Sequence, residues 1–520
     1  MNTAYTVFLF SILSFLRSLL GILTQTVVAH QFGASRWTDA YVLALSIPQV
    51  LGDFMIGGCL IFAMVPLSLE IREREGIGAQ RNFYSQVFFF LLLAAGAAAC
   101  VYAFWAPQMV RRLAPGFDDS TLKSAVRMAK MLSPMILLFA FSHFFSGIFL
   151  ARKQYFSLAL AGFCYPLTLI GFCLWTEPFL GQDRLIYGTL LGAFAQMLAA
   201  VILCLKEESF AFRVCFVWNQ LAKLFSLMYP IVWVVILNAL LSFQQKFFAS
   251  RTGEGGISCL NYAVILYGIP NVFIFSSLQT VLYPKFSEHA AKVETEKSAG
   301  LLARTIRFIF FTAVPVSGFL IILSPELVSI VYERGRFSAS DAGLTAGLLR
   351  LLLFGLFAQS VNEISGRFFY SQQKAWAYVK VIAGSTLLGI AANPFFFERL
   401  GMKGLGLSAS IVSMICFVGL LILLGRFYPE LKIFKVCRYL MKTFLISLFP
   451  LAVVFFLKQS DVFYFLRAQG FRGAIFYTAS LFSAGFFIYL ALAWSAKQKE
   501  AYWLIDFLNP SNWPGRKSKR

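Results

Sequence analysis

The feature that most constrains this chain is a succession of long apolar stretches that follow one another almost from end to end. A helix needs about 20 predominantly apolar residues to cross the roughly 30 Å hydrocarbon core of a bilayer. Because backbone polar groups there must be satisfied within the protein, such stretches predict helices. Only 13% of the 520 residues are charged, which leaves no room for a large soluble domain. The sequence therefore predicts an all-α polytopic membrane protein.

We expect about 14 transmembrane helices, whose ends are set by charged residues, Pro and Gly. They lie near residues 5–30, 38–64, 84–106, 125–149, 155–176, 185–205, 224–248, 258–284, 308–332, 343–370, 376–397, 404–425, 439–457 and 473–494. The first stretch lacks a basic start and is too long for the apolar region of a cleavable signal peptide. We therefore expect it to remain as a span.

The formal net charge of +21 comes from Lys and Arg in short loops, not on one amphipathic face, which speaks against nucleic acid. With a cytoplasmic N-terminus, the inside loops and the C-terminal tail together carry about 25 Lys and Arg against about 13 outside, which predicts that both termini are cytoplasmic. The basic tail is expected to contact anionic lipid heads.

The sequence offers no pattern for catalysis, metal binding or redox chemistry. The nine cysteines are scattered singly, with no C-x-x-C motif and no Cys/His cluster. No nucleophile elbow, P-loop or facing carboxylate pair is present. We expect no enzyme activity and no cofactor, and uphill transport would have to be coupled to an ion or to the membrane potential.

The first 205 residues resemble residues 225–425 at a nearly constant offset, which indicates an internal repeat. Matching positions, with offsets of 218 to 222, are Pro48 and Pro270, Pro66 and Pro284, Glu70 and Glu288, Gly116 and Gly335, Ser146 and Ser365, and Phe149 and Phe368. Each half holds six spans, an even number, so the halves enter the membrane in the same sense. We expect two parallel six-helix lobes around a central cavity, a basis for alternating access.

The predicted organisation has four parts. These are an N-terminal six-helix lobe (1–223), a C-terminal six-helix lobe (224–430), two additional transmembrane helices (431–495) and a basic cytoplasmic tail (496–520). The two additional spans lie outside the repeat, where they could form a side groove or an accessory surface.

Ionisable residues inside spans are costly, so function is sought among them. Arg17, Asp53 and Lys246 lie within spans and Asp39 opens the second one. All four belong to the first two spans of either repeat, the elements expected to line a cavity between lobes. There Arg17 and Lys246 could receive a phosphate or pyrophosphate head group. Alternatively, Arg17 and Asp53 neutralise each other, and Lys246 extends to the outer surface.

Other polar groups within spans have simpler explanations. Arg367 and Lys380 lie near the cytoplasmic ends of their spans, where interface anchoring is expected. His143 lies beside Ser142 and Ser146 in an apolar span, a setting typical of an interhelical hydrogen bond.

Several short motifs follow one another along residues 5–425. They are Phe32-Gly33-Ala34, Asp39-Ala40-Tyr41, Ile47-Pro48, Val65-Pro66, Glu70 to Gly76, Ala114-Pro115-Gly116-Phe117, Asn261-Tyr262-Ala263, Tyr332-Glu333-Arg334-Gly335 and Arg367-Phe368-Phe369-Tyr370. In this order and spacing they resemble the MurJ/MviN lipid II flippases of the MOP exporter superfamily. That resemblance implies a cationic cavity that holds the undecaprenyl pyrophosphate and sugars of lipid II while the lobes alternate.

Candidate site residues transfer from the resembling family one by one. Asp39 matches the family's acidic residue, and Lys246 stands where a basic residue is common. Arg17 lies one position before the family's first cavity arginine, whose place here is Ser18, a rotation of about 100° around the helix. Gln49 stands where the family has Asn. The candidate substrate-binding residues are therefore Arg17, Asp39, Gln49, Asp53 and Lys246.

Departures from the family pattern remove much of the positive cavity. Thr24 and Gln25 replace an Arg-Asp pair, Gly52 and Asp53 replace a basic pair, and Ile265 and Gly268 replace an arginine and a glutamate. Three hypotheses follow: a lipid II flippase with an altered cavity, an exporter of another lipid-linked oligosaccharide such as O-antigen or capsule, and a non-transporting scaffold that recruits cell-wall enzymes. A proton- or sodium-coupled drug exporter is a fourth. The resemblance implies a multi-pass protein of the bacterial inner membrane.

Overall fold

The computed structural model describes residues 3–52, 59–152, 154–206, 217–271, 277–292, 294–460 and 470–502, and in these ranges it contains helices and no strand. The first repeat spans α1 (Thr3–Phe32), α2 (Arg36–Gly52), α3 (Cys59–Glu75), α4 (Ile77–Leu113), α5 (Asp119–Leu132), α6 (Met135–Ala151), α7 (Tyr155–Trp175), α8 (Glu177–Leu180) and α9 (Arg184–Lys206). The remaining helices are α10 (Trp218–Ala249), α11 (Gly256–Pro270), α12 (Ser277–Ala291), α13 (Thr295–Ile322), α14 (Ser324–Tyr332), α15 (Ala339–Leu353), α16 (Leu356–Ser371), α17 (Ala375–Leu400), α18 (Met402–Phe427), α19 (Ile433–Gln459) and α21 (Gly470–Ser495).

The predicted all-α membrane architecture is confirmed. Among the described residues, nine helices are long and apolar enough to cross a membrane, or up to eleven if each of two bent pairs is one span. The exact number of 14 stays a prediction. The predicted spans at 38–64 and 258–284 each cover two helices, and the segments 53–58 and 272–276 between them lie outside the described residues.

Two predicted single spans are sharply bent helix pairs. α5 and α6 meet at 41°, and α15 and α16 meet at 52°. Pro134 stands at the first bend, where it has no N–H to continue the helix. Gly355 stands at the second, against Ser410 of α18. α6 and α16 begin at Met135 and Leu356, 221 positions apart, which supports the predicted repeat.

By contacts, the chain divides into two compact units. Unit 1 comprises Met1–Asn261 and Arg334–Ser338, and unit 2 comprises Tyr262–Glu333 and Ala339–Arg520. The units group residues by contact, whereas the predicted lobes 1–223 and 224–430 follow the sequence repeat. The lobe boundaries therefore stay a prediction, and α10 packs with unit 1.

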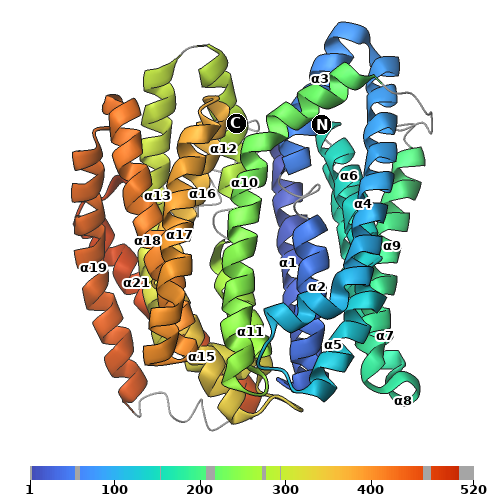
Figure 1. The fold of residues 1–520 in the computed structure, drawn as a ribbon. Coiled ribbons are helices and arrows are strands. Elements are labelled where there is room, and N and C mark those ends of the chain that lie inside the picture. The colour runs from blue at the N-terminus through green and yellow to red at the C-terminus, as the bar shows by residue number, and fades with distance from the viewer. Residues whose placement is uncertain are drawn as a thin grey trace, which may run out of the picture. The chain divides into compact units, whose positions relative to one another are not determined.

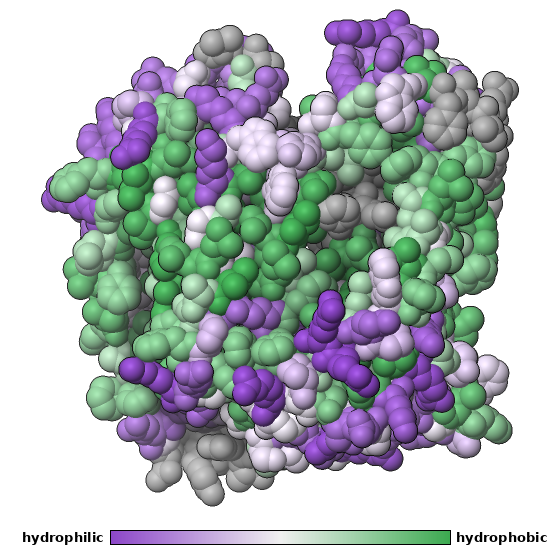
Figure 2. Space-filling model, in the orientation of Figure 1, coloured by the Kyte–Doolittle hydropathy of each residue, from purple (hydrophilic) through white to green (hydrophobic). Residues whose placement is uncertain are grey.

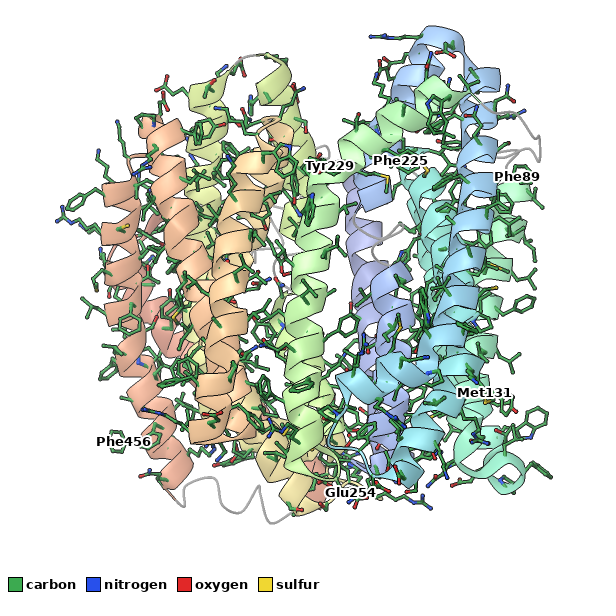
Figure 3. The ribbon with its side chains drawn as sticks, in the orientation of Figure 1. Phe89, Met131, Phe225, Tyr229, Glu254 and Phe456 are labelled. Carbon is green, nitrogen blue, oxygen red and sulfur yellow. The ribbon has the colours of Figure 1, made fainter. Side chains whose placement is uncertain are left out.

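In unit 1, α7 packs against α1 and α9, and α2 packs against α5 and α6 (Figure 1). Buried tyrosines join these helices: the Tyr102 hydroxyl of α4 donates to the Ala44 carbonyl of α2 at 2.8 Å, and Tyr41 and Thr189 share a hydrogen bond of 2.7 Å. α10 packs against α3 and α4, where Phe225 meets the edge of Phe90 at 5.0 Å between ring centroids (Figure 3).

In unit 2, α13 lies against α15, α16, α19 and α21. Its apolar side chains, including Phe311 and Phe319, form a core with Val454 of α19 and with Tyr489 of α21. The Tyr489 hydroxyl donates to the Phe311 carbonyl at 2.9 Å. The two helices beyond the repeat thus cover α13.

The surface of each unit fits a bilayer. On the face shown in Figure 2, hydrophobic side chains form a band in each unit between more hydrophilic ends. Large apolar side chains such as Phe104 of unit 1 and Phe456 of unit 2 are 76% and 67% exposed. A soluble protein rarely exposes apolar patches of this extent, whereas lipid tails can cover them.

Candidate transport site

A polar cavity of about 180 Å³ lies within unit 1, among three apolar helices. It is lined by Arg17, Gly21, Thr24 and Gln25 of α1, by Gly162, Tyr165 and Pro166 of α7, and by Gln196 of α9. None of these side chains is acidic. Because Arg17 is the one charged residue in this described lining, the cavity carries net positive charge. Such a cavity is suited to an anionic group.

Arg17 reaches this cavity because α7 carries a glycine beside it. A Cβ atom at Gly162 would lie 2.9 Å from Cδ and 3.3 Å from Nη1 of Arg17. The guanidinium offers five N–H donors in a planar fork, which matches the oxygens of a phosphate. His143 of α6 lies within electrostatic range of Arg17. Its predicted role in an interhelical hydrogen bond stays a prediction.

Gly162 gives a direct test of how Arg17 is positioned. We expect Gly162→Val to displace the guanidinium and to lower transport about tenfold or more, since a hydrogen bond to a charged group contributes roughly 1.5–3 kcal/mol. The initial transport rate in reconstituted vesicles measures this. Gly171, also on α7, has open space at its Cβ position, so Gly171→Val is the matched control. Equal rates for both variants would contradict the assigned position of Arg17.

Asp39 joins the beginnings of two helices within unit 1. It lies in the first turn of α2 and is 1% exposed. Its Oδ1 accepts hydrogen bonds from the backbone N–H and from the hydroxyl of Ser258, both at 2.7 Å. Ser258 lies in the first turn of α11, where unpaired N–H groups and the helix dipole favour a carboxylate. Asp39 therefore caps α11 from outside that helix.

The start of α2 is held in turn by the segment that follows α10. The carboxylate of Glu254, which follows α10 (Figure 3), accepts from the backbone N–H of Arg36 at the start of α2, at 3.4 Å. Arg36 also pairs with Asp118 in the loop before α5. Hydrogen bonds from Ser120 and Thr121, together with Arg36, hold the pKa of the Asp118 carboxyl below its usual range. Charged groups thus secure the start of α2.

Removing the Asp39 cap should measurably destabilise the protein. We expect Asp39→Ala to lower the free energy of unfolding by about 1–3 kcal/mol, because it leaves buried donors of Ser258 without their acceptor. Unfolding in detergent, followed by helical circular dichroism, measures this. Ser258→Ala removes only the hydroxyl donor, so it should cost less, and the double variant should cost less than the sum. Strictly additive losses would contradict the contact.

Two glycines pack against helix ends within unit 1. A Cβ at Gly116 would lie 2.0 Å from the carbonyl oxygen of Ser250, just after α10. A Cβ at Gly335 would lie 2.3 Å from the carbonyl oxygen of His30, near the end of α1. The Arg336 N–H also donates to that oxygen at 3.0 Å. Since Gly116 and Gly335 match in the repeat, each repeat places a glycine loop against the other repeat's first helix.

A second polar contact joins α3 to the first turns of α10 within unit 1. Lys223 Nζ contacts both carboxylate oxygens of Glu70, at 2.9 and 2.7 Å. The hydrogen bond from Lys223 lowers the pKa of Glu70 below its usual value. A cavity of about 170 Å³ lies here, lined also by Arg74, Glu75 and Gln220.

The five predicted site residues are not gathered into one cluster. Arg17 lines the cavity of unit 1, Asp39 caps α11, and Gln49 is exposed on α2. Lys246 of α10 is half-buried, with Nζ 5.9 Å from the centre of the Phe243 ring. Asp53 lies outside the described residues. Substrate contact by all five therefore stays a prediction.

Several cavity residues were not among the predicted site residues. Tyr165 and Gln196 are polar but uncharged, so a survey of ionisable residues within spans passed over them. Thr24 and Gln25 were noted only as departures from a family pattern, although both line the cavity beside Arg17. A search for any polar side chain in apolar spans would have found these four residues.

Comparison with known proteins finds a family model and relatives that are similar to this chain. The family model described as "Lipid II flippase MurJ" matches residues 28–469. A probable lipid II flippase MurJ from Buchnera aphidicola subsp. Schizaphis graminum is 26% identical over 422 residues, which cover 80% of this chain and 82% of the relative.

Solved structures share the fold. A structure described as lipid II flippase MurJ in an inward closed conformation has a TM-score of 0.77 at 20% identity, and the match covers 96% of this chain and 100% of that one. An inward-facing multidrug resistance MATE transporter of the MOP superfamily has a TM-score of 0.67 at 13% identity, with 81% and 96% covered. With the family model matched over most of its length, the chain belongs to the MurJ family.

Proposed function

We propose that this chain is a flippase that moves lipid II, the undecaprenyl-pyrophosphate-linked peptidoglycan precursor, from the inner to the outer leaflet of the bacterial cytoplasmic membrane. The observation that carries the proposal is the family match over residues 28–469. The cavity of unit 1 supports it, because Arg17 offers a cation without any acidic residue in the described lining. A pyrophosphate would bring the negative charge that this cavity lacks.

The mechanism we propose is alternating access, with the head group leaving water on one side and re-entering it on the other. An isolated pyrophosphate would not cross the hydrocarbon core unaided, because the transfer of a charged group into it is very costly. Arg17 lowers that cost by charge-assisted hydrogen bonds. Uncharged donors and acceptors nearby, such as Tyr165 and Gln196, suit sugar hydroxyls. No bond of the cargo needs to be made or broken.

We further propose that both termini are cytoplasmic, as the predicted charge bias indicates. The Asp39 cap and the two glycine contacts then lie at the outer end of unit 1, and the Glu70–Lys223 pair lies at its cytoplasmic end. Contacts with cell-wall synthesis enzymes belong to the same proposal, because the product must be consumed outside. A cysteine in place of Gly253, in the loop that follows α10, should react with an impermeant thiol reagent from outside.

A second candidate cargo is another polyprenyl-linked oligosaccharide. The uncharged Thr24 and Gln25 in the cavity favour it, because fewer charges are available for pyrophosphate and more neutral groups for sugars. The non-transporting scaffold is the third hypothesis, and it predicts that Arg17→Ala, Asp39→Ala and Lys246→Ala leave transport-dependent growth unchanged.

Reconstitution separates these candidates. Purified protein is placed in vesicles with fluorescent lipid II or with an undecaprenyl-pyrophosphate oligosaccharide of O-antigen type, and flipped lipid is scored by an added enzyme or quencher. The proposal expects faster flipping of lipid II than in protein-free vesicles. Flipping of the oligosaccharide alone would support the second candidate, and flipping of neither would support the scaffold.

A further inference from the structure

A carboxylate lies midway along α16 of unit 2, in a predicted membrane span, and is held by amide side chains. Oε1 of Glu363 accepts a hydrogen bond from Nδ2 of Asn271 at 2.7 Å and one from Nε2 of Gln359 at 3.2 Å. Gln359 in turn accepts from the hydroxyl of Ser413 on α18, at 3.5 Å. Asn271 directly follows Pro270 at the end of α11. The carboxylate therefore links α11, α16 and α18.

The same place in unit 1 has no charge. At the repeat offset of 219, Glu363 corresponds to Phe144 and Arg367 corresponds to Ile148. Both apolar side chains are fully buried on α6, so this fold packs well without ions there. A charged residue inside a membrane span is costly and is retained where it serves ions, protons or substrate. The charges of α16 thus have no counterpart at the matching positions of α6.

The amide of Asn271 suits both protonation states of Glu363. Its N–H donates to the ionised carboxylate, whereas its Oδ1 is buried and has no hydrogen-bond partner among the described residues. A protonated carboxyl group gains an O–H donor. Rotation of the Asn271 amide by half a turn would offer Oδ1 to that donor. An apolar residue at 271 could serve neither state.

Three ionisable groups lie within electrostatic range of Glu363: Arg367 on α16, Tyr267 on α11 and Tyr378 on α17. Further out, Tyr283 of α12 and Tyr370 of α16 lie near Arg367, and Cys416 of α18 lies near Tyr378. No group of three or more His, Cys, Asp or Glu side chains that could hold a metal ion occurs in the described parts of the chain. Arg367, one turn along the helix, opposes any added cation, and a sodium ion would in addition need several oxygen ligands. A proton needs only the single carboxylate.

We propose that Glu363 binds a proton during the transport cycle, and that proton uptake changes the Asn271 contact that holds the end of α11 to α16. The proton comes from water and forms an O–H bond on the carboxylate, and no other covalent bond changes. The proposal deepens the proposed flippase function and rests on it for its cargo. It names the proton as the coupling ion.

Infrared difference spectroscopy tests the proton site without any transport. Full-length protein in lipid nanodiscs is titrated from neutral to acidic pH, and the band of a protonated buried carboxylic acid is followed. We expect the wild type and Glu294→Gln to show the band and Glu363→Gln to lose it. Glu294 is the matched control because it lies between α12 and α13, outside the predicted spans, and forms an ion pair with Lys297 in the first turn of α13. An unchanged band in Glu363→Gln would overturn the proposal.

Asn271→Leu tests the amide. Because the Asn271 N–H donates to the charged form, its loss should move the midpoint of the band to higher pH. A midpoint equal to that of the wild type would show that the Asn271 contact does not respond to the proton. Because Leu at 271 is apolar, circular dichroism must show the helical content of the wild type, and Asn271→Ala is the smaller alternative with the same expected shift.

Coupling is tested in vesicles loaded with lipid II. If one proton moves with each lipid, a gradient of one pH unit should change the ratio of outer to inner lipid about tenfold. Glu363→Gln should abolish this response. A response to a sodium gradient instead of a pH gradient would overturn the proposal. If lipid II is not flipped at all but the infrared band depends on Glu363, the proposed function fails while the proton site stands.

Discussion

Arg17→Ala is expected to lower lipid II flipping by roughly 10- to 100-fold, because a hydrogen bond to a charged group contributes about 1.5–3 kcal/mol. Arg17 supplies the one charge of the described lining of the unit 1 cavity. A pyrophosphate entering without it would lose its ionic partner. The initial rate in reconstituted vesicles, at equal protein content, measures the effect.

Arg17→Lys is the informative companion variant. It keeps the charge but loses the planar fork, so we expect a rate between those of the wild type and Arg17→Ala. Arg399, at the end of α17 in unit 2 and over the ring of Phe395, provides a matched control, and Arg399→Ala should leave the rate unchanged. A wild-type rate in Arg17→Ala would contradict the assigned role of the cavity.

Gly335→Ala is expected to have the largest effect on stability, with a loss of about 1–3 kcal/mol or more in the free energy of unfolding. Its added Cβ would lie 2.3 Å from the His30 carbonyl oxygen, and Gly335 has φ +61°, a conformation that itself costs roughly 1–2 kcal/mol for alanine. Gly116→Ala meets the Ser250 oxygen at 2.0 Å without a positive φ. Thermal unfolding in detergent, followed by circular dichroism, compares them.

The control for both is Gly171→Ala on α7, where the Cβ position is open. It should be neutral or slightly stabilising, since alanine favours helix over glycine by roughly 1 kcal/mol. Comparable unfolding temperatures for Gly335→Ala, Gly116→Ala and Gly171→Ala would show that the chain moves readily at these loops. The close packing at Gly116 and Gly335 would then make no measurable contribution to the free energy of unfolding.

Much of the fold could be predicted from the sequence, because membrane spans are defined by long apolar runs. Every predicted span falls on one or more helices. A proline inside a span, such as Pro134, does predict a bend. The bend at Gly355 was not predicted, because a glycine within a span leaves run length unchanged while altering direction. Grouping by contact was also not predicted: Phe225, in the predicted second lobe, packs against Phe90 of the first, and hydropathy carries no information on such partners.

The candidate site was harder to predict, because side-chain direction depends on packing. Arg17 was predicted as a cavity residue and does line a polar cavity, with walls from α7 and α9 that no local pattern indicates. Asp39 was predicted to contact substrate, and its observed partner is Ser258, 219 positions away.

Lipid II export is tested in cells in which this protein is the sole candidate flippase. The fraction of newly synthesised lipid II that an externally added lipid II-cleaving enzyme can reach is measured before and after depletion of the protein. We expect this fraction to collapse on depletion and to stay low when Arg17→Ala is supplied. An unchanged fraction after depletion would contradict lipid II export by this protein.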